Sequence, residues 1–169
     1  MKSLDSARAN STPEIVFAQS QDHFAVFREL CREYAASLPA IGLSLEYQGF
    51  EEEMASLPGR YAPPSGAILL VRQGGGWAGC VALRPMDEPG VCEMKRMYVR
   101  PSARGLGLGK LLGREVVEHA ARVGHRVMRL DTDKNMAAAI GLYEGLGFSP
   151  RSRYNGDPCP CTLWFERSL

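Results

Sequence analysis

The sequence predicts an α/β (α+β) domain with a single mixed, mostly antiparallel sheet of six to seven strands, flanked by about four helices. Three observations predict this fold class. Two apolar runs form a hairpin, a glycine-rich loop opens directly into an amphipathic helix, and helices and strands alternate after that helix. The 169 residues, of which 45% are apolar, suffice for one domain with a hydrophobic core. We therefore expect residues 1–12 to form a flexible leader and residues 13–169 to form a single domain.

The first half of this domain is predicted to hold one strand, two helices and three further strands. Phe24, Phe27 and Leu30 belong to a run of apolar residues at three- and four-residue steps, which is typical of an amphipathic helix, and Pro39 ends it. Residues 73–76, Gln-Gly-Gly-Gly, separate two apolar runs as a hairpin turn does. The expected elements are strands at 14–19, 67–72, 77–83 and 91–99, and helices at 24–38 and 45–57.

The second half is predicted to alternate helix and strand before a final hairpin. Leu108, Leu112 and Val116 begin one helical stripe, and Gly147 is placed to cap a later helix. Residues 155–156, Asn-Gly, are typical of a tight turn between two strands. The expected elements are helices at 108–123 and 137–146, a strand at 127–130, and two strands that flank the Asn-Gly turn.

Composition and charge exclude several classes of protein. The net charge is +1 and 23% of the residues are charged, so nothing in the overall balance indicates nucleic-acid binding. No apolar run approaches the roughly 18 residues that cross a bilayer, and the first dozen residues are unlike a signal peptide. We therefore expect a soluble, cytoplasmic protein without membrane contacts.

The cysteines and histidines predict no metal site. The five cysteines lack the spacing of a disulfide framework and indicate free thiols in a reducing compartment. Cys159 and Cys161 form the one close pair, and a strand position suits them better than metal ligation because no third ligand lies nearby in sequence. The three histidines are scattered, and residues 131–133, Asp-Thr-Asp, are interpreted as a strand end followed by a helix cap.

The glycine-rich loop before the helix at 108 predicts an anion-binding site. The first amides of a helix have no intrahelical partners and lie at the positive end of its dipole. Gly105, Gly107 and Gly109 leave room for a ligand and allow the backbone to turn its N–H groups inward. Arg104 and Lys110 add charge, and Lys and Arg outnumber Glu between residues 93 and 130. That basic cluster suits a polyanionic ligand, although a solvated helix face would have the same composition.

Two other phosphate-binding loops fit this segment poorly. A Walker-type loop would need Gly in place of Arg104 and Ser or Thr in place of Leu111. A Rossmann loop would lie in a parallel βαβ unit, whereas hairpin strands precede this one.

Two motifs together resemble the GNAT superfamily of acetyl-CoA-dependent N-acyltransferases. Arg104-x-x-Gly107-x-Gly109 is similar to its pyrophosphate loop, Arg/Gln-x-x-Gly-x-Gly/Ala. Residues 142–148, Leu-Tyr-Glu-Gly-Leu-Gly-Phe, are similar to its late helix, and the predicted order of elements agrees from Glu14 onward. The resemblance implies a GNAT-like fold and acyl transfer from acetyl-CoA without a metal. The stretch 79–148 resembles a bacterial subgroup.

The resemblance also implies which residues bind acetyl-CoA. Met97, Tyr98 and Val99 are expected to offer backbone groups to the pantetheine arm, with the Met97 amide as the oxyanion donor. Core packing of the Met97 and Val99 side chains is compatible with that role. The pyrophosphate is expected to bind mainly main-chain N–H groups of Arg104, Gly105, Leu106, Gly107, Leu108, Gly109 and Lys110.

Glu93 is the candidate general base. A lysine-like amine with a pKa of about 10.4 is neutral in roughly one molecule in two thousand at pH 7, so a base assists its attack. Glu93 lies eleven residues before Arg104, where some superfamily members carry a glutamate base, and the apolar strand around it could raise its pKa. The alternatives are an ion pair with Lys95 or Arg96, and water as the base.

Tyr143 is the candidate general acid. Coenzyme A leaves as a thiolate, and Tyr143 matches the superfamily tyrosine whose phenol donates the proton. The alternative for Tyr143 is core packing on an amphipathic helix. Superfamily members often carry Asn seven residues before that tyrosine, but this chain has Met136 there and Asn135 one place earlier, which weakens a role for Asn135.

The acceptor stays open at this stage. We expect a small-molecule amine, cationic or amino-acid-like, and a protein lysine or N-terminus or a non-catalytic acyl-CoA sensor are the alternatives. An acidic stretch at residues 46–53 is compatible with a cationic acceptor or with a solvated helix face. A homodimer is a further assembly that the resemblance allows. The residues considered for acceptor contacts are Tyr47, Tyr61, Arg84, Tyr154 and Asn155.

Overall fold

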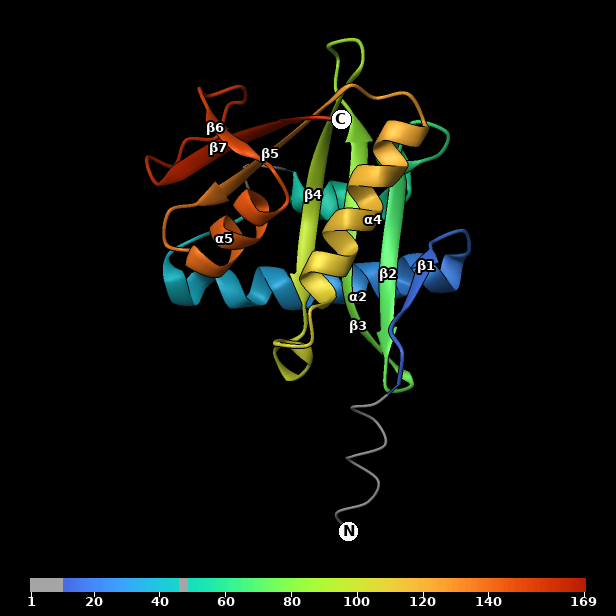
Figure 1. Cartoon of the computed structure of the whole chain (residues 1–169). Helices are drawn as coiled ribbons and strands as arrows, with labels where there is room; N and C mark the ends of the chain where they lie inside the picture. Colours follow the sequence, from blue (N-terminus) through green and yellow to red (C-terminus); the bar gives the residue numbers. More distant parts are fainter. Residues whose placement is uncertain (1–10, 46–48) are drawn as a thin grey trace.

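The computed structural model describes residues 11–45 and 49–169, in which one seven-stranded sheet organises the chain (Figure 1). The strand order is β1-β2-β3-β4-β5-β7-β6, and every neighbouring pair is antiparallel except β4 and β5. The predicted fold class is confirmed. The elements are β1 (Glu14–Phe17), α2 (Gln21–Ser37), η1 (Leu38–Ile41), α3 (Phe50–Ala55), η3 (Gly59–Tyr61), β2 (Ala67–Gln73), β3 (Gly76–Pro85), β4 (Val91–Val99), η4 (Pro101–Ala103), α4 (Leu108–Arg122), β5 (Val127–Asp133), α5 (Ala137–Gly145), β6 (Ser149–Arg151) and β7 (Thr162–Ser168).

Helices cover both faces of the sheet. α4 lies against one face and α2 against the other (Figure 1). β2 shows how a strand serves both layers, because Leu69 packs with the α4 core while Ile68 and Leu70 pack with the α2 core. A strand buried on both faces therefore appears as a continuous apolar run, as the stretch 67–71 does.

Of the two helices on the α2 face, α2 differs only slightly from its expected range of 24–38, whereas α3 covers less than half of the expected 45–57. α2 begins after Ser20, whose hydroxyl accepts a hydrogen bond from the His23 amide at 3.2 Å, and it ends at Ser37 just before Pro39. α3 is shorter than expected and starts after Gly49, which has a φ of 65°. Residues 1–10 and 46–48, which include most of the predicted leader together with Glu46 and Tyr47, lie outside the described residues.

The predicted tight turn at Asn155 and Gly156 is wrong. β6 ends at Arg151 and β7 begins at Thr162, so a ten-residue loop joins them instead. The Asn155 side chain donates to Asp131 Oδ2 at 2.5 Å and accepts from Trp164 Nε1 at 2.8 Å. Because its amide is engaged by two other strands, Asn155 anchors a long loop over β5 rather than shaping a two-residue turn.

β4 and β5 pair over three residues and then diverge (Figure 1). Their parallel register runs from Val91 opposite Val127 to Glu93 opposite Arg129. A bulge lies further along β4, where the register to β3 shifts between Cys80 and Ala82 and Arg96 has a φ of 57°. The bulge bends β4 and leaves its second half unpaired on the β5 side.

Within the described ranges, no helix combines the length and the apolar character that a membrane span requires.

Candidate active site

A cavity of about 360 Å³ lies where β4 and β5 diverge. Its walls come from residues 94–97 of β4, 131–133 of β5, α5, Tyr34 of α2, and the loop segments 42–45 and 157–159. Its size falls within the range of small-molecule sites, about 300–1,000 Å³. The divergence of the two parallel strands therefore creates this cavity.

Tyr143 forms part of this cavity wall. It is 8% exposed, and no group in the described part of the chain is hydrogen-bonded to its hydroxyl. Gly147, at a φ of 85°, ends α5 and returns the chain so that the Phe148 amide donates to the Tyr143 carbonyl and the two rings pack edge to face. Burial raises the pKa of the Tyr143 phenol, and the nearby Tyr34 and Asp131 add to that effect. The phenol thus stays protonated at neutral pH and faces the cavity.

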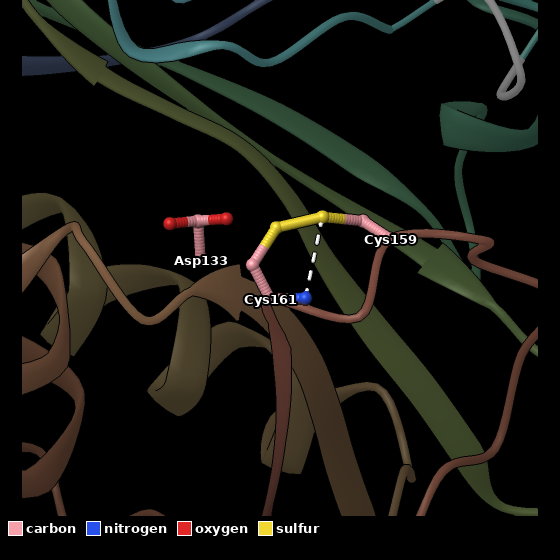
Figure 2. Close-up of side chains that lie close together, drawn as sticks. All are labelled: Asp133, Cys159 and Cys161. Atoms are coloured by element: carbon pink, nitrogen blue, oxygen red, sulfur yellow. Dashed lines mark hydrogen bonds between the residues drawn. A yellow bond between two sulfur atoms is a disulfide. The ribbon is translucent and has the colours of Figure 1, made fainter.

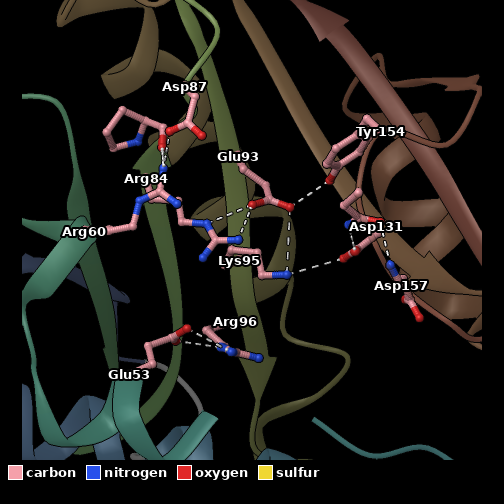
Figure 3. Close-up of polar contacts among 12 residues, drawn as sticks. Glu53, Arg60, Arg84, Asp87, Glu93, Lys95, Arg96, Asp131, Tyr154 and Asp157 are labelled. Carbon is pink, nitrogen blue, oxygen red and sulfur yellow. Dashed lines mark hydrogen bonds and ion pairs between the residues drawn. The ribbon is translucent and has the colours of Figure 1, made fainter. Parts of the chain in front are cut away.

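Glu93 is not among the residues that line the cavity, and its partners surround it (Figure 3). Its carboxylate is 2% exposed and accepts hydrogen bonds from Arg84 Nε and from the Tyr154 hydroxyl, each at 2.8 Å. Lys95 Nζ lies 3.8 Å from it. Burial alone would raise the pKa of Glu93, but Lys95, Arg84 and Tyr154 together outweigh it and lower the pKa. The expected rise toward neutrality is therefore wrong, because Lys95 on the same strand, Arg84 on β3 and Tyr154 in the loop before β7 surround the buried carboxylate.

The lowered pKa of Glu93 predicts a loss of stability in acid. A depressed folded-state pKa contributes stability that is complete above the ordinary value of 4.5 and is lost as the pH falls below it. We expect Glu93→Gln to reduce the slope of unfolding free energy against pH in this acid range, measured by urea denaturation. Glu118→Gln, on the exposed face of α4, is the control and should keep the wild-type slope. An unchanged slope for Glu93→Gln would contradict the ion-pair assignment.

Lys95 and Arg96 carry positive charge into the cavity wall, whereas the sequence suggested them only as ion-pair partners of Glu93. Lys95 Nζ is 6% exposed and lies 3.5 Å from Asp131 Oδ1, a distance too long for a strong hydrogen bond (Figure 3). Their signal in the sequence was the charged run Glu93-Met-Lys-Arg inside an otherwise buried strand. Charged residues in such a strand need buried partners or a ligand.

Arg96 is bound by Glu53 of α3. The Arg96 guanidinium donates to both Glu53 carboxylate oxygens, at 2.9 and 3.0 Å, and the Tyr61 hydroxyl donates to the same carboxylate at 2.8 Å. Burial would raise the pKa of Glu53, but the hydrogen bonds from Arg96 and Tyr61 lower it. Glu53 is thus a buried ion-pair partner and not part of a solvated face, whereas Glu51 lies on such a face and meets Arg32 in solvent.

The second half of β4 has no strand of the described ranges paired on its β5 side, although the Val99 carbonyl accepts from Arg104 Nε at 3.2 Å. β5 pairs with β4 no further than Glu93, and Met97 lines the cavity. The Tyr98 side chain lies on the opposite face within the α2 core, and Val99 packs with the α4 core. Backbone contacts to an extended ligand are therefore compatible with buried side chains at Tyr98 and Val99.

The glycine-rich loop ends beside the cavity. Helical hydrogen bonding in α4 begins with the Leu111 amide and the Gly107 carbonyl, so the preceding amides have no helical acceptor. A β-carbon on Gly109 would lie 3.4 Å from Leu142, which lines the cavity. Arg104 and Lys110 are exposed and form no ion pair within the described residues. The Arg104 amide donates to the Pro101 carbonyl at 3.3 Å, whereas the amides of residues 105–110 have no acceptor within the described residues, so the loop holds these amides and two cations close to Leu142 of the cavity wall.

Met136 stands where superfamily members often carry Asn, and it and Asn135 differ in their position relative to the cavity. Met136 lines the cavity. The Asn135 amide donates to Asp133 Oδ1 at 2.7 Å, and Asn135 is not among the cavity residues.

The prediction of free thiols holds for three cysteines and is wrong for two. Cys31, Cys80 and Cys92 are buried free thiols. Cys159 and Cys161 form a disulfide in the loop before β7 and are not in a strand (Figure 2). The Asp157 carboxylate accepts from the Cys159 amide at 2.9 Å and from the Thr162 hydroxyl at 2.7 Å, which folds the loop back and brings the two sulfurs together.

Several known proteins are similar to this chain in sequence or in fold. The model of the acetyltransferase (GNAT) family matches residues 26–148. An uncharacterized N-acetyltransferase of Schizosaccharomyces pombe is 41% identical over 144 residues, covering 85% of this chain and 86% of that protein. Human N-acetylaspartate synthetase is 32% identical over 136 residues, 74% of this chain and 45% of that protein. A putative acetyltransferase from Salmonella typhimurium, solved with its cofactor acetyl-CoA, superimposes with a TM-score of 0.65 at 20% identity, covering 94% of this chain and 95% of that one.

The fold and these relatives define an acyltransferase of the N-acetyltransferase class. The chain belongs to the acetyltransferase (GNAT) family, and the predicted resemblance is confirmed.

Proposed function

We propose that the protein transfers an acetyl group from acetyl-CoA to the primary amine of a small, amino-acid-like acceptor, by direct attack in a ternary complex. The observation that carries the proposal is the cavity between β4 and β5, which holds buried charges and a cavity-facing phenol and whose wall residue Leu142 lies beside Gly109 of the glycine-rich loop. A thioester that enters from the loop side would meet an amine held among those charges.

The acetyl-CoA part of the proposal uses the backbone. The amides of residues 105–110, with the side chains of Arg104 and Lys110, would hold the pyrophosphate at the start of α4. The β5-side edge of residues 97–99 would align the pantetheine as an added strand, with the Met97 amide as the oxyanion donor. No metal takes part in these steps.

Two side chains handle the protons in the proposal. Tyr143 would donate its phenolic proton to the departing thiolate. Its raised pKa keeps the phenol protonated at neutral pH. Glu93 would act as base by way of water, because its carboxylate does not line the cavity and its pKa is lowered. Glu93→Gln should then lower kcat at neutral pH and move the pH–rate profile, and a profile that superimposes on that of the wild type would indicate water alone as the base.

The amino-acid-like acceptor rests on the charges in the cavity wall. Lys95 has ammonium protons that its long contacts to Glu93 and Asp131 leave available, and these suit an acceptor carboxylate. Asp131 offers a carboxylate to the acceptor amine. The similarity to a relative whose name gives N-acetylaspartate as its product supports the same class.

A panel of acceptors tests this function. The full chain would be incubated with acetyl-CoA and with amino acids, polyamines, aminoglycosides or peptides with free N-termini, and thiol release and acetylated product would be measured. We expect the amino acids to give product. Product from peptides alone would replace the small acceptor by a protein, and tight acetyl-CoA binding without transfer to any amine would indicate a sensor.

A separate prediction tests whether the glycine-rich loop binds the pyrophosphate of coenzyme A. Gly107 precedes α4 at a φ of 76°, a conformation that costs an alanine about 1 kcal/mol. We expect Gly107→Ala to weaken coenzyme A binding by about fivefold, measured by calorimetry, because the strained loop loses its arrangement of amides. Gly141→Ala is the control. Its α5 site has open space for a β-carbon, so binding should not change. Equal affinity for wild type and Gly107→Ala would contradict the loop assignment.

A further inference from the structure

Three potential ligand atoms meet at the edge of the cavity and have no part in acetyl transfer. Asp133 at the end of β5 lies beside Cys159 and Cys161, which belong to the loop before β7 (Figure 2). A carboxylate oxygen and the two sulfurs all lie within 4.8 Å of one another. Asp133 and Cys159 also line the cavity.

One oxygen of Asp133 lacks a partner. Asp133 is 5% exposed, and its Oδ1 accepts the Asn135 amide. Its Oδ2 is buried and has no hydrogen-bond partner within the described residues. Leaving a buried carboxylate oxygen unsatisfied costs free energy, and such an atom calls for an explanation such as an ion.

The two sulfurs are held in place by the loop backbone and not by their bond alone. The Cys159 amide donates to Asp157, and the Cys161 carbonyl accepts the Lys134 amide at 2.9 Å. The Thr162 amide donates to the Cys159 carbonyl at 3.3 Å. Opening the disulfide would therefore leave both side chains next to Asp133.

We propose that the reduced form of Cys159 and Cys161 binds Zn²⁺ together with Asp133 Oδ2, and that the disulfide closes this site. Thiolates and carboxylates are ligands of zinc, at about 2.3 Å for sulfur and about 2.0–2.2 Å for oxygen. Two atoms bound to one ion then lie about 3 to 4 Å apart, which the oxygen–sulfur spacing within 4.8 Å nearly meets and which the two sulfurs reach by separating once their bond opens. Zinc is usually four-coordinate, so the three ligands leave a fourth position open.

The redox step is a two-electron exchange. A thiol or phosphine reductant supplies two electrons, the bond between the sulfurs breaks, and each sulfur gains a proton. Zinc then displaces both thiol protons, so binding releases protons and is weaker in acid. In the oxidised form the sulfurs are bonded to each other and are no longer thiolates. The site therefore binds metal in one redox state only.

Zinc titration of the full chain in both redox states tests the proposal. Thiol counting assigns the states, since the chain has five cysteines and three of them are free in the present form. We expect calorimetry to show one zinc ion per reduced chain and none per oxidised chain. A thiolate-to-cobalt absorption band, read on the reduced wild type, should report the sulfur ligands independently of any variant.

Variants assign the ligands. The double variant Cys159→Ser, Cys161→Ser retains the three buried thiols and should bind no zinc. Asp133→Asn should weaken binding by about tenfold or more, whereas Asp131→Asn, two residues earlier on β5, should retain it. Melting curves establish that each variant is folded. The proposal is overturned if the reduced wild type binds no zinc or cobalt, or if the double-serine variant binds zinc as tightly as the wild type.

Discussion

Tyr143→Phe is expected to lower kcat by about 10² to 10³, the usual contribution of a general acid. The phenol faces the cavity, and its pKa is raised by burial, so it is protonated at neutral pH and available to the departing thiolate. Coenzyme A affinity should barely change, because the proposed cofactor contacts come from other elements. Steady-state kinetics and calorimetry measure the two quantities separately.

Tyr34→Phe is the matched control for this experiment. Tyr34 is a second tyrosine of the cavity wall whose pKa is also raised by burial. Removing either hydroxyl makes a similar change in volume and polarity, so Tyr34→Phe should keep kcat close to the wild-type value. The Tyr143 hydroxyl has no hydrogen-bond partner in the described part of the chain, so Tyr143→Phe should also leave stability nearly unchanged. The acid assignment fails if Tyr143→Phe and Tyr34→Phe have the same kcat.

Glu53→Ala is expected to lower the unfolding free energy by about 3–5 kcal/mol, because it leaves the buried Arg96 guanidinium without its bidentate partner. The Arg96 side chain is 2% exposed and that of Glu53 is 16% exposed, so solvent screens the pair little. The same change removes the acceptor of the Tyr61 hydroxyl. Urea denaturation of the full chain measures the effect.

Glu51→Ala, on the same helix, provides the comparison for Glu53→Ala. Glu51 meets Arg32 at 3.5 Å in solvent, and exposed pairs of this kind contribute about 0–1 kcal/mol. Both variants remove a glutamate from the first turn of α3, so their difference isolates the buried pair. Equal losses would show that Arg96 does not depend on Glu53.

Local pattern explains the elements that were predicted well. The hairpin at residues 73–76, the strand at 91–99 and the start of the helix at 108 follow from glycine placement and apolar spacing over a few residues. Asn155 shows the limit of such a signal. Its Asn-Gly sequence favours a tight turn, but contacts with Asp131 and Trp164 outweigh that preference.

The pKa of Glu93 and the buried ion pair of Glu53 were predicted poorly, because each depends on residues that are distant in the chain. Glu93 lies in an apolar strand, which suggested a raised pKa, yet Arg84 and Tyr154 approach from other strands and loops and lower it. Glu53 was indistinguishable from Glu51 in sequence, and only the fold distinguishes them, because it pairs Glu53 with buried Arg96 and Glu51 with exposed Arg32.

The sequence by itself determined the family, the order of the elements, the glycine-rich loop and the tyrosine of α5, because these rest on short motifs and on apolar periodicity. The tertiary structure decided which of those residues share a cavity. The divergence of β4 from β5 opens it, the β4 bulge brings Arg96 to Glu53, and the loop before β7 brings Cys159 and Cys161 to Asp133. Such contacts join residues that no local pattern relates, and their energies depend on burial that exists only in the folded chain.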